Sequence, residues 1–218
     1  FTKTFDTQTY ISENQISVQM AARDLRYEWF DSLCQEHSFD HILTAHHLDD
    51  DLETFFINLS RGSGIRGLAG IPEINDRIIR PLLIFSKKEI IDFATVKDLK
   101  WREDHSNSKT DYLRNQIRHE IVPEFIKLNE SALKNFRRTK EQLGESLELI
   151  DEYLVFISNL ICSEIQEGIQ FDIVKLKDLP HTHAVLYELL SPYGFSAWED
   201  IGGLLNAQTG KMIYSGSH

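Results

Sequence analysis

Hydrophobic and polar positions change their period within residues 41–60, from a short apolar run to a helical repeat. Residues 41–44 form the short run and predict a buried strand. At about 100° per residue, the side chains that follow separate onto two faces of a helix. The apolar face carries Leu48, Leu52, Phe55, Phe56 and Leu59, and the opposite face carries His46, Asp50 and Glu53. The pattern predicts a strand that leads into a helix, at the position where open α/β sheets bind ligands.

The polar face of this helix allows two interpretations. Carboxylates near the start of a helix stabilise its positive end, so Asp50 and Glu53 could serve only the helix dipole, with His46 an ordinary N-terminal histidine. The loop after the helix favours a ligand site instead, because it holds four glycines where ending a helix needs one. Such a loop brings its backbone close to a phosphate or a nucleotide. Its first residues are Arg61, Gly62, Ser63 and Gly64.

An earlier helix carries a pair of basic residues. The apolar spacing predicts this helix over residues 12–37. Arg23 and Arg26 lie three positions apart on one of its faces, which suits binding of an anion and equally suits pairing with the helix's own acids.

A second pair of arginines follows a loop rich in turn formers at residues 101–107. Asp111 or a neighbour is expected to cap the helix that carries Arg114 and Arg118, which share one stripe at i and i+4. These arginines could contact an anionic ligand, or Arg118 could pair with an acid such as Asp104.

The remaining pattern predicts a smaller set of scaffold elements and a mostly helical second half. Ser86 and Glu89 form a capping box before a helix over residues 87–97. Further strands are predicted at 78–83, 171–174 and 211–214, and further helices at 129–167, 181–191 and 197–206. We expect an α/β fold, with a parallel sheet followed by a mostly helical second domain.

Composition limits the function classes. The net charge of −11 over 218 residues argues against a general nucleic-acid binder, yet residues 61–140 are net positive. On the helix after residue 129, the basic side chains Lys134, Arg137, Arg138 and Lys140 could contact nucleic-acid phosphates or form ordinary surface ion pairs. No apolar run reaches the roughly 20 residues that cross a bilayer. Two distant cysteines predict reduced thiols in a cytoplasmic protein.

Five motifs stand in a fixed order between about residues 21 and 125: AHHLDDDLET, RGSGIRGLAGIP, IIRPLL, WREDHSN and LRNQIRHEIVPEF. In order and spacing they are similar to the tRNA(Ile)-lysidine synthases, which belong to the N-type ATP pyrophosphatase or PP-loop group. The resemblance implies a partial doubly wound, adenine nucleotide alpha hydrolase-like parallel sheet over residues 1–125. It also implies a mostly helical tRNA-binding domain over residues 126–218, cut short at its C-terminus.

The resemblance implies a ligase. The enzyme would adenylate C2 of the wobble cytidine, position 34, of a tRNA(Ile) with a CAU anticodon, using ATP and Mg²⁺. The amine of L-lysine would then displace AMP to form lysidine. The sequence leaves the oligomeric state open, with a homodimer as one expectation.

The resemblance also implies roles for individual residues. His46 would contact the adenylated intermediate, and Asp50 and Glu53 would recognise the lysine. As oxygen ligands these two carboxylates also suit Mg²⁺. The remaining implied contacts, to ATP phosphates or tRNA, involve Arg23, Arg26, Arg61, Gly62, Ser63, Gly64, Arg114, Asn115, Arg118, Arg137 and Arg138.

One family motif is missing. The nucleotide loop Ser-Gly-Gly-x-Asp-Ser occurs nowhere in the sequence. We therefore expect a fragment that lacks the N-terminal phosphate loop and is inactive alone. Two alternatives stay open, namely a metal-dependent phosphohydrolase that uses His46, Asp50 and Glu53, and a non-catalytic tRNA-binding module.

Overall fold

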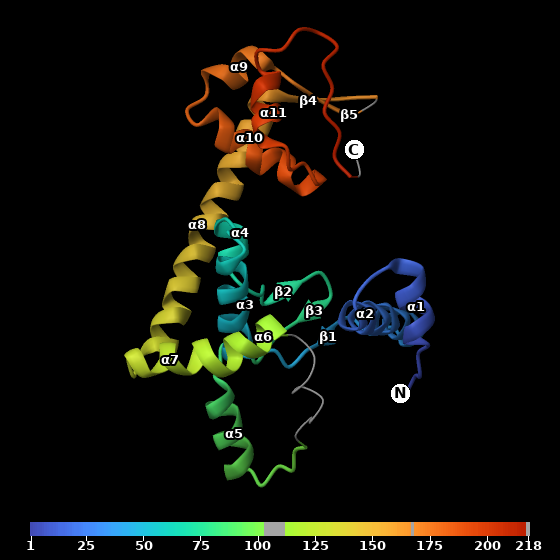
Figure 1. The fold of residues 1–218 in the computed structure, drawn as a ribbon, viewed down its shortest axis with the longest axis vertical. Coiled ribbons are helices and arrows are strands. Elements are labelled where there is room, and N and C mark those ends of the chain that lie inside the picture. The colour runs from blue at the N-terminus through green and yellow to red at the C-terminus, as the bar shows by residue number, and fades with distance from the viewer. Residues whose placement is uncertain (103–111, 167, 217–218) are drawn as a thin grey trace. The chain divides into compact units, whose positions relative to one another are not determined.

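The structure, a computed structural model, describes residues 1–102, 112–166 and 168–216. They form two compact units, Phe1–Gly144 and Glu145–His218, whose elements are labelled in Figure 1. We expected a second domain from residue 126. The packing instead divides at Gly144, inside a long helix, and the boundary of the sequence domains after residue 125 stays a prediction.

A small sheet in the first unit positions the start of the polar helix. Its strands are β1 (Ile42–Leu43), β2 (Ile74–Asn75) and β3 (Ile78–Ile79), in the order β1-β3-β2. β1 and β3 are parallel, so their carboxyl ends lie together, and the Thr44 N–H donates to the Ile79 carbonyl at 3.0 Å. The sheet and its helices confirm the α/β class. The strand expected at 78–83 ends early, because a turn begins at Arg80.

The first two helices correct the expectation of one helix over residues 12–37. They are α1 (Thr7–Asn14) and α2 (Val18–His37). Gln15 ends α1 with a left-handed backbone at φ 54°, and the Ser17 side chain accepts the Met20 N–H to start α2. Ser17, a favourable N-cap residue, therefore starts a second helix inside the segment for which the apolar pattern predicts one.

α3 (Leu48–Ser60) is the polar helix that the sequence predicts. A capping box starts it, because His47 Nδ1 accepts the Asp50 N–H and the Asp50 carboxylate accepts the His47 N–H. Leu48 and Leu52 are buried as expected. Leu59, expected on the core face, is 50% exposed at the end of the helix.

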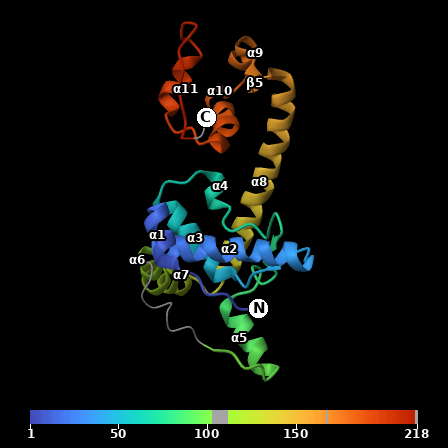
Figure 2. The same ribbon diagram turned by 90° about the vertical axis from the view of Figure 1, so that its right-hand side faces the viewer.

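Several short helices complete this part of the first unit. α4 (Ile65–Leu68) follows the glycine loop, and the Ser86 capping box starts α5 (Lys87–Val96) as predicted. α6 (Tyr112–Gln116), the π-helix η2 (Ile117–Ile121) and α7 (Val122–Leu128) form one continuous run. Figures 1 and 2 show this run crossing the N-terminal end of α3. The expected cap at Asp111 lies outside the described residues.

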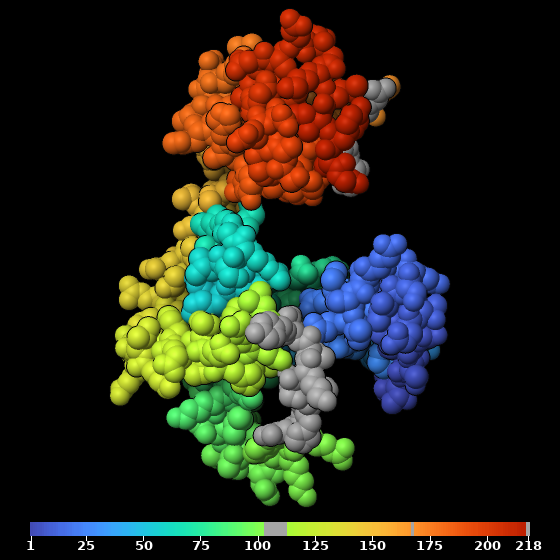
Figure 3. Space-filling model, in the orientation of Figure 1, coloured from blue at the N-terminus to red at the C-terminus, as the bar shows by residue number. Residues whose placement is uncertain are grey.

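α8 (Ala132–Ile161) contributes its first half to the same core. The Phe136 and Phe55 rings meet edge to face at 5.4 Å, and Figure 3 shows the surfaces of the two helices adjoining. α8 was expected to reach residue 167. It ends at Ile161, because the chain turns into a hairpin of β4 (Cys162–Ile165) and β5 (Gly168–Phe171).

The second unit continues with α9 (Ile173–Asp178), α10 (Thr182–Leu190), the 3₁₀ turn η3 (Ser191–Tyr193) and α11 (Trp198–Leu204). The strand expected at 171–174 is wrong, since Asp172 caps α9 there. No strand forms over the described residues 211–214, against expectation. The core of this unit contains Ile157, Ile161, Leu176, Val185, Leu186 and Ile201.

A buried acid fixes the other face of α3. Asp51 is fully buried, and its carboxylate accepts the Ile71 N–H at 2.6 Å while Lys140 Nζ lies 2.5 Å away. Lys140 also donates to the Ile71 carbonyl at 3.0 Å. Gly70 has φ 78°, and a Cβ there would collide with the Asp51 carboxylate. One ion pair therefore joins α3, this loop and α8.

Removing Lys140 should strongly destabilise the first unit. Lys140→Met leaves the Asp51 carboxylate buried without its counter-charge, so we expect the free energy of unfolding in urea to fall by about 3–5 kcal/mol. The double variant Asp51→Asn/Lys140→Met should recover most of that loss. Arg137→Met is the matched control, since Arg137 is exposed on the same helix, and should change stability by less than about 0.5 kcal/mol. Equal losses for Lys140→Met and Arg137→Met would contradict the role of this ion pair.

Candidate functional site

A cavity of about 1460 Å³ lies in the first unit where β1 ends and α3 begins. Its wall also includes side chains from α2, α5, the π-helix and α7. This is the edge of the sheet at which the sequence predicts a ligand site. The charged and imidazole groups that matter most in its wall are Arg26, His46, Asp50, Glu53, Lys87 and Arg118.

Glu53 is the centre of an ion cluster. Its side chain is only 4% exposed, and both carboxylate oxygens accept guanidinium donors. Arg118 binds it through Nε at 2.6 Å and Nη2 at 2.8 Å, and Arg114 adds a third bond through Nε at 3.2 Å. Two N–H donors arranged as a fork match the two oxygens of a carboxylate, so this arrangement is both strong and directional.

Asp50 extends the cluster by one turn of α3. One of its oxygens lies 3.4 Å from Arg118 Nη2, and the other accepts the His47 N–H in the capping box. The hydrogen bond to Glu53 raises the pKa of the Arg118 guanidinium. Two carboxylates and two guanidinium groups therefore make a cluster whose charges balance.

His46 enters the cavity beside this cluster. Its Nδ1 lies 3.0 Å from the Thr44 hydroxyl, which orients the ring. Burial lowers the pKa of the imidazole below its ordinary value of 6.5, and this effect outweighs the opposing effect of the Asp50 carboxylate. The ring is therefore neutral at pH 7, and a neutral imidazole can accept a proton or share a hydrogen bond with a ligand.

The donor atoms do not fit the Mg²⁺ site proposed for Asp50 and Glu53. Both Glu53 oxygens already face arginines, and a nearby guanidinium disfavours a divalent cation at the same atoms. Within the described ranges, no group of three or more His, Cys, Asp or Glu side chains is arranged to hold a metal ion. Magnesium stays a prediction from the resemblance.

The structure brings together some of the predicted site residues. His46, Asp50, Glu53 and Arg118 meet at the cavity, and Arg114 joins them through Glu53. The alternative in which Asp104 neutralises Arg118 concerns a residue outside the described part of the chain.

Of the two arginines on α2, one reaches the cavity. Arg26 lines its wall. Arg23 instead stacks over the Tyr27 ring at 4.9 Å, a cation–π contact. The anion-binding role of the two arginines stays a prediction, and Arg26 is the one that borders the cavity.

The glycine loop lies apart from the cavity. Arg61, Gly62, Ser63 and Gly64 follow the far end of α3, whose 13 residues span about 20 Å at 1.5 Å per residue. None of them belongs to the cavity wall, and neither does Asn115. Their roles in binding a phosphate or a nucleotide stay predictions without a contact in this structure.

The basic residues of α8 divide into two groups. Lys134, Arg137 and Arg138 are exposed, and Arg137 pairs with Glu141 at 3.1 Å. Lys140 is not a surface cation, since its side chain is 17% exposed and is bound to Asp51. The interpretation of Lys140 as a phosphate contact is therefore corrected.

Prediction from the sequence missed some residues of the cavity wall. Lys87 was assigned only to a scaffold helix, yet it lines the cavity and its N–H donates to the Asp49 carboxylate at 2.7 Å. The capping box at Ser86 was a usable signal, because it places the start of α5 and Lys87 with it. Trp101 and Arg102 also line the wall, and they open the WREDHSN motif, to which no role in the site was assigned from the sequence.

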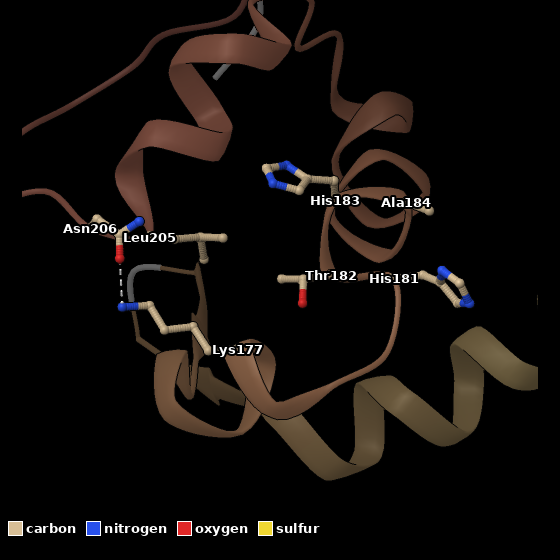
Figure 4. A pocket seen from close by; sticks show the side chains of 7 residues that line it. All are labelled: Lys177, His181, Thr182, His183, Ala184, Leu205 and Asn206. Carbon is tan, nitrogen blue, oxygen red and sulfur yellow. Dashed lines mark hydrogen bonds between the residues drawn. The ribbon is translucent and has the colours of Figure 1, made fainter.

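The second unit has a cavity of its own, of about 570 Å³. Figure 4 shows His183, Thr182 and Lys177 around it, with Lys177 Nζ donating to the Asn206 side chain at 3.0 Å. His181 points to the other side of the start of α10 (Figure 4). The two histidines therefore do not face a common point.

The low pKa of His46 gives a pH dependence with a defined sign. Because burial disfavours the charged ring in the folded state, protonation opposes folding, and stability is lost as the pH falls below 6.5 towards the folded pKa. We expect the His46 ring signal in NMR to titrate below pH 6.5, with His46→Gln identifying the signal. The wild type should lose stability relative to this variant between pH 7 and the folded pKa, by at most about 1.4 kcal/mol per pH unit. A titration midpoint at or above 6.5 would show that the ring is not desolvated.

Comparison with known proteins covers nearly the whole chain. The family model of the PP-loop domain matches residues 2–125, and the model of the TilS substrate binding domain matches residues 164–218. Across the described residues, no helix is both long enough and apolar enough to cross a membrane.

Curated relatives named tRNA(Ile)-lysidine synthase align with the chain. The protein from Porphyromonas gingivalis is 37% identical over 98% of this chain and 47% of its own length. Those from Chlorobaculum tepidum and Bacillus subtilis are 35% and 32% identical, over 98% and 82% of this chain and 66% and 39% of their own lengths. The chain thus spans about half the length of most of these relatives. The model of the PP-loop domain matches more than half of the residues of this chain, and the chain therefore belongs to the PP-loop family.

Proposed function

We propose that the protein joins lysine to C2 of the wobble cytidine of tRNA(Ile), forming lysidine at the expense of ATP. The observation that carries the proposal is the cluster of Asp50, Glu53, Arg114 and Arg118 beside a ligand-sized cavity at the carboxyl edge of a PP-loop sheet. The names of the relatives, which align over almost the whole chain, support the substrate.

The reaction has two steps, and the cluster supplies charges suited to both. In the first step, O2 of the cytosine attacks the α-phosphorus of ATP, and pyrophosphate leaves. Negative charge develops on the phosphoryl oxygens, and Arg118, which lines the cavity, is placed to stabilise it. In the second step, the lysine amine attacks C2 and O2 leaves with AMP.

The second step needs a group that accepts protons from the lysine ammonium. Asp50 and Glu53 provide carboxylates that recognise the ammonium, and the neutral ring of His46 lies beside them at the cavity. A base within hydrogen-bond reach can take the proton that the amine must lose before it attacks. His46 is assigned to the adenylated intermediate, and the carboxylates to the amine.

Docking of the tRNA is assigned to exposed basic residues. Lys134, Arg137 and Arg138 lie on the first half of α8 with their side chains exposed, where phosphate contacts are sterically open. The acidic net charge of the whole chain limits binding to such local patches. L-lysine as second substrate, the CAU anticodon, a cytoplasmic location and a homodimer belong to the same proposal.

The two alternative functions have weaker support. A phosphohydrolase based on His46, Asp50 and Glu53 would need these groups free for a metal, whereas two arginines bind the carboxylates. A purely tRNA-binding module would give no reason for a buried carboxylate held between two guanidinium groups at a cavity.

Neutralising either carboxylate should slow the reaction in the molecules that stay folded. In the intact protein, Asp50→Asn and Glu53→Gln should each lower lysidine formation per folded molecule by about 10²-fold or more, because each removes a charge at constant shape. Mass spectrometry of the tRNA wobble nucleoside measures the product. Asp92→Asn, an exposed carboxylate on α5, is the control and should keep full activity. Retained activity in both variants would favour the helix-dipole interpretation.

A further inference from the structure

The two arginines of the cluster hold Glu53 in different ways. Arg114 also donates through Nη2 to the Thr54 hydroxyl at 3.1 Å, and it is not part of the cavity wall. Arg118 lines the cavity, although its side chain, at 33% exposed, is no more exposed than that of Arg114 at 37%. Arg114 is therefore fixed within α3 and α6, whereas Arg118 borders the space that a ligand would fill.

Arg118 occupies the atoms that a bound cation would need. Its Nε and Nη2 take one oxygen each of Glu53, and Nη2 also reaches Asp50 at 3.4 Å. An ammonium group that binds these carboxylates must compete for the same lone pairs. It would also add a third positive charge to a cluster whose four charges already balance.

A phosphate group in the cavity changes this balance. Guanidinium groups bind phosphate oxygens as strongly as they bind carboxylates, so a phosphate offers Arg118 a second partner. Once Arg118 turns towards the phosphate, the remaining cluster of Asp50, Glu53 and Arg114 has a net negative charge. A primary amine can then take the place of Arg118 beside the two carboxylates.

We infer that Arg118 is the exchangeable counter-ion of a cation site made by Asp50 and Glu53, so that polyphosphate and lysine ammonium bind cooperatively. This inference rests on the proposed function for the identity of the two ligands. Because coupling between two binding sites is reciprocal, lysine should strengthen polyphosphate binding by the same factor. The amine would then bind weakly until the phosphate partner is present, and each substrate would favour the binding of the other.

Calorimetry of the intact protein tests the coupling. L-lysine is titrated with and without saturating inorganic triphosphate, with sodium chloride matching the ionic strength. The wild type should bind lysine about 5- to 150-fold more tightly with triphosphate, the usual range for coupled sites. Arg118→Gln should bind lysine more tightly than the wild type when triphosphate is absent, and triphosphate should then change its affinity by less than about twofold.

Arg114→Gln is the matched control, because it removes the same charge from the cluster but leaves Arg118 able to exchange. It should keep the coupling between triphosphate and lysine. Coupling that persists in Arg118→Gln, or a fall in its affinity for lysine, would overturn the inference.

A second measurement holds even if Arg118→Gln folds poorly. In ¹⁵N NMR of the wild type, triphosphate alone should shift the Nε–H signal of Arg118, which Arg118→Lys identifies by its loss. An unshifted signal at saturating triphosphate would also overturn the inference. If coupling is present but the intact protein forms no lysidine, the proposed reaction fails while the exchangeable counter-ion stands. If lysidine forms without coupling, the proposed reaction stands and the exchangeable counter-ion fails.

Discussion

The burial of the Glu53 carboxylate between two guanidinium groups is the interaction on which the site depends. A carboxylate removed from water is stable only when charge and hydrogen bonds compensate for its lost hydration. Three N–H donors do so here, and they come from a run of helices that is far from α3 in the sequence. The fold must therefore hold α3 and the α6–π-helix run in one fixed relation, or Glu53 loses its partners.

The opposite face of α3 is fixed by a second buried carboxylate. Asp51 and Glu53 are two positions apart, so their side chains leave the helix on nearly opposite sides. Asp51 joins α3 to the loop at Ile71 and to α8, and Glu53 joins it to α6 and the π-helix. Asp50, directly before Asp51, is thus carried on a helix that is held from both sides. A π-helical turn at Arg118 fits this picture, since such turns are rare and occur often at functional sites.

The sequence predicted the elements whose signals are local. The helical period placed Asp50 and Glu53 on one face, and the Ser86 capping box placed the start of α5. His46 reaches the same cavity, but it precedes the N-cap His47 and is not part of the helix that the period predicted. Prediction from the sequence failed where a contact depends on residues that are far apart in the chain. Asp51 stands among the acids of the first turn of α3, and nothing nearby marks Lys140 as its partner. The same holds for Glu53 and Arg118, whose pairing requires two helices to pack.

Other misses have a similar cause. The apolar pattern of α8 continues through Cys162 and Ile165, yet that segment pairs with β5 as a strand. Apolar spacing alone does not separate a helix from a hairpin that buries the same residues. The glycine loop after α3 stays a predicted phosphate contact, and its distance from the cavity follows from the length and direction of α3.

Glu53 and Arg118 should act as one unit in the reaction. A double-mutant cycle tests this expectation most directly, with single-turnover lysidine formation measured in Glu53→Gln, Arg118→Gln and the double variant of the intact protein. The account predicts strong non-additivity, with the double variant about as slow as the slower single variant, because either change already breaks the unit. Rate losses that multiply in the double variant would show that the two side chains act independently, and would contradict the account.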